Sequence, residues 1–92
     1  MFNNLDYSPV YNYTYYKNNY EDLRKAFGND ESAYFKHFCI YGMKEGRQAI
    51  ATFNVQKYQS YYADLRKAFG NDLPAYYKHY IQYGKKEGRK TT

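Results

Sequence analysis

A repeat of 42 residues constrains the fold of this chain more than any other feature of its sequence. The segment DLRKAFGND at Asp22–Asp30 recurs unchanged at Asp64–Asp72. Residues 12–47 align with residues 54–89 without a gap, and 22 of the 36 aligned positions are identical. Such a period is typical of architectures in which each copy is one small unit of secondary structure. The predicted organisation is an N-terminal extension (1–11), repeat 1 (12–47), a connection (48–53), repeat 2 (54–89) and a tail (90–92), with both repeats in one module.

The first half of each repeat predicts a helix. Asn12 and Asn54 suit the N-cap position, and an aromatic residue stands just before and four residues after each, which is the spacing of a hydrophobic staple. Aromatic and leucine side chains then follow at steps of four, three and four, on one helical face. We expect Gly28 and Gly70 to end this helix, because glycine most easily adopts positive φ. The face consists of Tyr16, Tyr20, Leu23 and Phe27 in repeat 1, and of Tyr58, Tyr62, Leu65 and Phe69 in repeat 2.

The second half of each repeat predicts a second helix. Asp30 and Asp72 suit its N-cap, and Pro74 lies in its first turn, where a missing N–H is tolerated. We expect Gly42 and Gly84 to end it, before a Lys-Glu-Gly-Arg turn whose glycine has positive φ. The connection 48–53 contains neither glycine nor proline, which indicates a packed segment. The sequence therefore predicts an all-α fold of two stacked helical hairpins, each with a short glycine-containing C-terminal turn.

The composition argues against several functions. The formal net charge is +5, divided as +1 in repeat 1 and +4 in repeat 2. This balance favours anionic partners, but it is small for a nucleic-acid-binding protein, and acidic residues are interleaved with the basic ones. No metal-ligand spacing is present, and we expect no cofactor. The one cysteine, Cys39, is replaced by Ile81 in repeat 2, which indicates a small packed hydrophobe. No segment is long and apolar enough for a membrane span, and the N-terminal residues lack the pattern of a signal peptide.

The sequence offers no constellation of catalytic residues. His37 and His79 are the only histidines, and they occupy the same register. We interpret them as partly buried side chains bonded to backbone or to a carboxylate such as Glu45 or Glu87. The alternatives are ligand contact and a metal site formed by the two histidines across the repeat axis. Flanking Arg and Lys residues keep Asp22 and its equivalent Asp64 ionised. No serine lies in a nucleophile motif. We therefore expect the chain not to be an enzyme.

The shared residues resemble a known bacterial repeat. The elements are Tyr-x-x-x-Tyr-x-Asp-Leu, Ala-Phe-Gly-x-Asp, Lys-His-Phe/Tyr and Tyr-Gly-x-x-Glu-Gly-Arg, and both copies carry them. This pattern resembles tandem repeats of secreted bacterial proteins that accompany cell-wall hydrolases, glycosidases and proteases, including C-terminal regions of clostridial and phage lytic enzymes. The resemblance implies an accessory targeting domain, outside the cell or on the cell wall. Export would then depend on a signal elsewhere or on phage-induced lysis.

The first functional hypothesis is recognition of a cell-wall polysaccharide or an anionic wall polymer. Tyrosine supplies both a ring for sugar C–H faces and a hydroxyl for hydrogen bonds. The end of the second helix and the turn after it combine tyrosine with basic residues in both copies, and two weak sites would give avidity on a repetitive lattice. The alternative interpretation is that these shared residues are structural. The candidates are Tyr41, Lys44 and Arg47, then Tyr83, Lys86 and Arg89, with His37 and His79 as further contacts.

The second hypothesis is self-association through surplus tyrosines. The chain has 15 Tyr and 6 Phe among 92 residues, more aromatic surface than a small domain easily buries. Tyrosines that the repeats do not share fall off the predicted apolar faces, and exposed aromatics often mark protein–protein surfaces. A homodimer would cover them. The residues are Tyr13, Tyr15, Tyr61 and Tyr77. Nucleic-acid binding ranks third.

Overall fold

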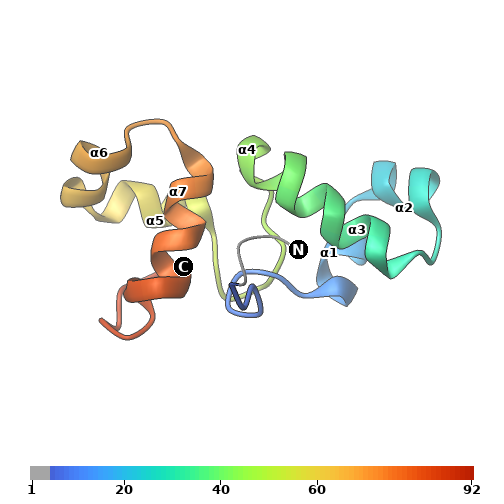
Figure 1. Ribbon diagram of the computed structural model, residues 1–92, viewed down its shortest axis with the longest axis horizontal. Helices are drawn as coiled ribbons and strands as arrows, with labels where there is room; N and C mark the ends of the chain where they lie inside the picture. The colour runs from blue at the N-terminus through green and yellow to red at the C-terminus, as the bar shows by residue number, and fades with distance from the viewer. Residues whose placement is uncertain (1–4) are drawn as a thin grey trace.

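The computed structural model describes residues 5–92, and within that range it is all-helical, as predicted (Figure 1). Its extended contacts in that range are two isolated β-bridges, Tyr11 with Ala49 and Ile50 with Phe53. None of its helices is long and apolar enough to cross a membrane. Repeat 1 contains α1 (Tyr13–Asn19), α2 (Glu21–Phe27), α3 (Glu31–His37), the π-helical turn η1 (Phe38–Gly42) and α4 (Met43–Glu45); repeat 2 contains α5 (Val55–Tyr61), α6 (Ala63–Phe69), α7 (Leu73–His79) and the π-helical turn η2 (Tyr80–Gly84).

The predicted helix starts are confirmed with one qualification. The side chains of Asn12 and Asn54 accept hydrogen bonds from backbone N–H groups three residues on, at 2.9 and 3.0 Å. Asp30 caps α3 in the same way. Asp72 stands at the N-cap of α7 but its side chain makes no capping bond; Pro74 is in the first turn, as expected. These local bonds satisfy backbone donors that a helix leaves open at its start.

The first predicted helix is broken in two, so a single helix from Asn12 to Phe27 is wrong. Tyr20 separates α1 from α2 with extended backbone angles (φ −133°, ψ 98°), and Tyr62 does the same in repeat 2 (φ −125°, ψ 101°). The Tyr20 hydroxyl donates to the carbonyl of Gln48 at 2.9 Å. Arg24 Nη1 donates to the carbonyls of Lys17 and Asn18, which the break leaves without helical partners. Long-range and side-chain bonds therefore outweigh the helical periodicity at this point.

The second predicted helix does not end at Gly42, because the run continues into α4, and this part of the prediction is wrong. In repeat 2 the helical run does end at Gly84, as predicted. Gly42 has helical angles (φ −60°, ψ −43°) inside a continuous run from α3 through η1 to α4. A Cβ at Gly42 would overlap the Tyr16 hydroxyl, and one at Gly84 would overlap the Tyr58 hydroxyl. Glycine is required here for close packing rather than for a turn. The positive φ predicted for the following turn is confirmed, at 73° for Gly46 and 68° for Gly88.

One core tyrosine of each repeat donates a short-range hydrogen bond that is the same in both copies. Tyr34 is fully buried and donates to the carbonyl of Gly28 at 2.5 Å, and Tyr76 donates to that of Gly70 at 2.6 Å. Because a buried hydroxyl without a partner is costly, this arrangement lets tyrosine rather than leucine fill the core. Cys39 packs against the same core, as expected for a small hydrophobe, and burial raises the pKa of its thiol to about 11.

The two repeats contact each other mainly through α4 and α7 (Figure 1). Tyr77 on α7 is completely buried, so its predicted exposure as a surplus tyrosine is wrong. Its hydroxyl donates to the carbonyl of Arg47 at 2.7 Å, and its ring packs on Phe38 and Phe53. Of the other unshared tyrosines, Tyr61 is exposed, whereas Tyr13 and Tyr15 are partly buried. The connection is packed, with Ala49 and Phe53 buried.

Candidate ligand-binding grooves

The final arginine of each repeat is held in an intramolecular clamp. Arg47 forms two parallel bonds to the Asp22 carboxylate, at 2.8 and 3.2 Å, and a third to Glu45 at 2.7 Å. Its guanidinium also lies over the Tyr20 ring, 4.7 Å from the centroid. The clamp lowers the pKa of Asp22 and raises that of Arg47. In repeat 2 the same clamp joins Arg89 to Asp64, Glu87 and Tyr62.

This clamp accounts for motifs that are far apart in the sequence. Asp22 belongs to the shared Asp-Leu element and Arg47 to the Glu-Gly-Arg element, 25 residues later. A bidentate arginine–carboxylate pair is geometrically specific, so lysine could not replace the arginine without loss. The carboxylate is held by this distant arginine rather than by its basic sequence neighbours. We therefore assign Arg47 and Arg89, which the sequence analysis offered as ligand contacts, to the closure of each repeat.

Each histidine is bonded to a buried tyrosine rather than to backbone or Glu45. Tyr16 Oη lies 2.8 Å from His37 Nδ1, and Tyr58 Oη lies 2.8 Å from His79 Nδ1. Burial, followed by the positive charge of the clamp arginine, lowers the pKa of both histidines. Both rings are thus held in one orientation and are neutral near pH 7. No hydrogen bond of Nε2 occurs in either ring among residues 5–92.

A groove lies beside each histidine, at equivalent positions in the two repeats. Its lining combines a phenylalanine from the end of the second helix of the repeat with residues of the third helix and the π-helical turn. The cavity volumes are about 260 Å³ in groove 1 and 300 Å³ in groove 2. Groove 1 is lined by Phe27, Ala33, Lys36, His37, Ile40 and Tyr41; groove 2 is lined by Phe69, Ala75, Lys78, His79, Gln82 and Tyr83.

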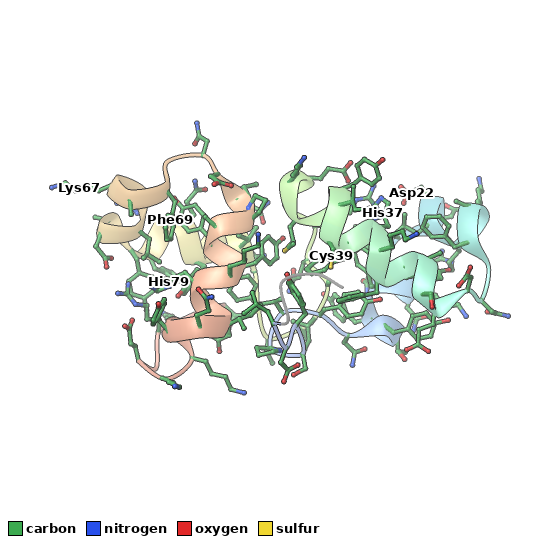
Figure 2. The ribbon with its side chains drawn as sticks, viewed as in Figure 1. Asp22, His37, Cys39, Lys67, Phe69 and His79 are labelled. Atoms are coloured by element: carbon green, nitrogen blue, oxygen red, sulfur yellow. The ribbon has the colours of Figure 1, made fainter. Side chains whose placement is uncertain are left out.

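One exposed tyrosine forms the outer edge of each groove. Tyr41 and Tyr83 are 56 % and 57 % exposed, and each ring lies 5.6 Å from the histidine ring, centroid to centroid. In Figure 2, His79 and Phe69 lie in the same half of the molecule, while the Lys67 side chain points away from its body. The grooves therefore combine aromatic surface with a fixed imidazole and one ammonium group.

The predicted site residues divide into three groups. His37 and Tyr41 come together in groove 1, and their equivalents come together in groove 2. Lys44 is exposed on α4 and does not line a groove. The arginines belong to the clamps. Lys86 is also exposed and outside groove 2, His79 and Tyr83 line that groove, and Arg89 closes repeat 2.

The phenylalanine, the alanine and the lysine of each groove, with Ile40 and Gln82, were not among the predicted site residues. Ala33, Lys36, His37, Ile40 and Tyr41 follow one another at steps of three, one, three and one, which places them on one helical face. That spacing was available from the sequence. The contribution of Phe27 was not, because it depends on how α2 folds back on α3, where its ring meets His37 at 5.9 Å.

A larger cavity, of about 540 Å³, lies between the N-terminal extension and the start of α1 and α3. It is lined by Asp6, Tyr11 and Glu31, among others, and the Tyr11 hydroxyl is buried with no hydrogen-bond partner among residues 5–92. Five of its ten lining residues belong to the N-terminal extension, which is not part of either repeat. The grooves are the duplicated feature, so we regard them as the candidate site.

Groups of three or more acidic, histidine or cysteine side chains able to hold a metal ion do not occur among residues 5–92. No family model, curated protein or solved structure matches this chain.

Proposed function

We propose that this chain is a non-catalytic binding module that attaches to a repetitive polymer of the bacterial cell wall through its two grooves. The observation that carries the proposal is the duplication of one groove, with five of six lining positions identical. A purely structural role explains why both copies keep the clamps and the tyrosine–histidine pairs. It does not explain why both copies keep a tyrosine that is more than half exposed at the same position.

The chemistry of the grooves suits a carbohydrate. Aromatic rings pack against the C–H faces of sugars, while hydroxyl, imidazole and ammonium groups bond to sugar oxygens. The volumes lie at the lower limit of ordinary ligand pockets, which run from about 300 to 1,000 Å³. Each groove therefore suits about one sugar unit, and affinity must come from using both grooves on one chain or lattice. The bacterial wall as target, and a location outside the cell, come from the resemblance of the repeat motif.

Co-sedimentation with purified sacculi from a panel of Gram-positive bacteria tests the proposal. We expect the full chain to pellet with sacculi of at least one species. Tyr41→Ala or Tyr83→Ala alone should weaken binding about tenfold or more, and the double variant should abolish it, because avidity multiplies two weak sites by about 10²–10⁴. Tyr61→Ala is the matched control, since Tyr61 is also exposed but lies outside both grooves.

Failure of the unmodified chain to pellet with any sacculus at low salt contradicts the proposal. Equal loss in Tyr61→Ala and Tyr41→Ala contradicts the assignment of the site. Circular dichroism and thermal unfolding of every variant separate loss of binding from loss of the fold.

Self-association remains a second proposal, because Ile40 and Tyr41 lie next to each other and are both exposed, at 37 % and 56 %. Adjacent apolar side chains of this kind also suit a protein–protein contact. Light scattering at micromolar concentration separates the two cases. A dimer that Tyr41→Ala dissolves would favour self-association, and a monomer throughout would exclude it.

A further inference from the structure

Each groove contains one lysine whose ammonium group forms no ion pair among residues 5–92. Lys36 and Lys78 are the charged side chains that line the grooves, and the linings contain no carboxylate. Neither lysine forms an ion pair in the described part of the chain, whereas both clamp arginines do. An ammonium group without an internal partner is available to an anion from outside.

The histidine beside each lysine is oriented by the core. Nδ1 of His37 is bonded to Tyr16, so the ring cannot turn without breaking that bond. When the tyrosine hydroxyl donates to Nδ1, the remaining nitrogen, Nε2, carries the proton and is a donor. A fixed N–H donor next to an ammonium group is suited to bind an anionic oxygen. The aromatic rings of Phe27 and Tyr41 meanwhile offer apolar surface to the carbon skeleton of the same unit.

We infer that, if the proposed function holds, the grooves select an anionic polymer whose repeat unit joins a sugar or polyol to a phosphodiester or carboxylate group. Lys36 and Lys78 contact the anionic group, and Tyr41 and Tyr83 pack against the carbon skeleton. The two sites are not equal. Repeat 2 carries a net charge of +4 against +1 in repeat 1, and position 82 is glutamine where position 40 is isoleucine. Groove 2 therefore binds the anionic unit more tightly.

Four probes separate the anion from the sugar. They are untreated sacculi, sacculi stripped of phosphodiester-linked polymers by hydrofluoric acid, a soluble glycerol-phosphate polymer, and polygalacturonate as the carboxylate arm; dextran is the neutral control. We expect the chain to bind untreated sacculi and one of the two anionic polymers. If the anion is a phosphodiester, binding to stripped sacculi should be at least tenfold weaker. If the anion is a carboxylate, binding to stripped sacculi should be unchanged and the chain should bind polygalacturonate. Dextran should not bind.

Paired charge variants test the residues. Lys36→Met/Lys78→Met should weaken binding to the anionic probe about tenfold and reduce its salt dependence, because two direct ion contacts are lost. Lys25→Met/Lys67→Met is the matched control: it removes the same charge from equivalent positions of α2 and α6, outside the grooves. Lys25 has only an exposed pair with Glu21 at 3.8 Å. The control should retain binding within twofold.

The outcomes distinguish this inference from the function on which it rests. If no sacculus binds the unmodified chain, the proposed function fails. If stripped sacculi bind as well as untreated ones and neither anionic polymer binds, the wall-binding function stands and this inference is overturned. Equal losses in the two lysine double variants also overturn it, because net charge rather than the grooves would then explain binding.

Discussion

Tyr16 and Tyr58 show how single residues link several of the shared motifs. Tyr16 packs on Tyr11 and Phe38, bonds to His37, and occupies the space that a side chain at Gly42 would need. Tyrosine, histidine and glycine are therefore retained in both copies as one packed unit. The clamp arginine is a second such unit, since it joins Asp22, Glu45 and Tyr20 at one point.

At the residue scale, Gly84→Ala should destabilise the protein. The added methyl group would displace the Tyr58 hydroxyl from its bond to His79, and overpacking of this kind costs about 1–3 kcal/mol. Urea unfolding measures the loss in the free energy of unfolding. Combining it with Tyr58→Phe, which removes the hydroxyl, should cost less than the sum of the two single variants, because both act on the same bond. Strict additivity would contradict the proposed overlap, and Ser32→Ala on the exposed surface of α3 serves as a neutral control.

At the scale of elements, the tyrosine–histidine pairs tie α1 to the end of α3, and α5 to the end of α7. The break at Tyr20 lets α2 turn back across α3, so that Phe27 meets both Tyr34 and His37. The π-helical turn then carries Tyr41 to the outer edge of the groove. Each groove is therefore made by the junction of three short elements, and its geometry depends on the bonds between them.

These pairs should make stability fall as the pH drops below about 6.5. The pKa of His37 and His79 is lower in the folded protein than its ordinary value of about 6.5, mainly because of burial. Below that value the unfolded chain binds more protons than the folded one, so protonation favours unfolding. The free energy of unfolding, measured with urea at pH 7.5 and 5.5, should be smaller at pH 5.5.

The clamp aspartates do not contribute to the difference in stability between pH 7.5 and pH 5.5. The clamp lowers the pKa of Asp22 and Asp64, so their contribution is lost only below about pH 4. A His37→Gln/His79→Gln variant is the control, and it should lose most of the difference between the two pH values. An unmodified protein that is equally or more stable at pH 5.5 would contradict the interpretation of these pairs.

At the scale of the whole molecule, the junction between the repeats covers the end of repeat 1 but leaves the end of repeat 2 exposed. Met43 and Gly46, at the end of repeat 1, are buried, whereas Lys85 and Gly88 at the equivalent positions of repeat 2 are exposed. Gln56 donates to the carbonyl of Gly46 at 3.0 Å across the junction. Repeats that bury surface against a neighbour in this way gain stability from that neighbour.

Tyr77→Phe should weaken this junction. The variant leaves the carbonyl of Arg47 without its 2.7 Å, part-buried hydrogen bond, which costs about 1–3 kcal/mol. Tyr83→Phe is the matched control, because the Tyr83 hydroxyl has no hydrogen bond within residues 5–92 and surface changes usually stay within about 0.5 kcal/mol. Urea unfolding with an unchanged m-value measures both. Similar stability of the two variants would show that the bond does not contribute to the junction.

The sequence alone determined the features that depend on near neighbours. The 42-residue period is read directly from the sequence. The caps at Asn12 and Asn54, the staples and the positive φ at Gly46 rest on spacings of a few residues, and the structure confirms them. The all-helical class followed from the same local patterns. His37 and Tyr41 could be recognised as neighbours because four residues separate them on a helix.

Only the tertiary structure decided the features that depend on distant residues. The helix break at Tyr20 depends on Gln48 and Arg47, and the glycine at position 42 depends on a hydroxyl from α1. The role of the arginine depends on a carboxylate 25 residues earlier. Periodicity cannot reveal such choices, because a helix-forming pattern and a competing long-range bond differ by only about 1 kcal/mol and only the folded chain brings the competing groups together.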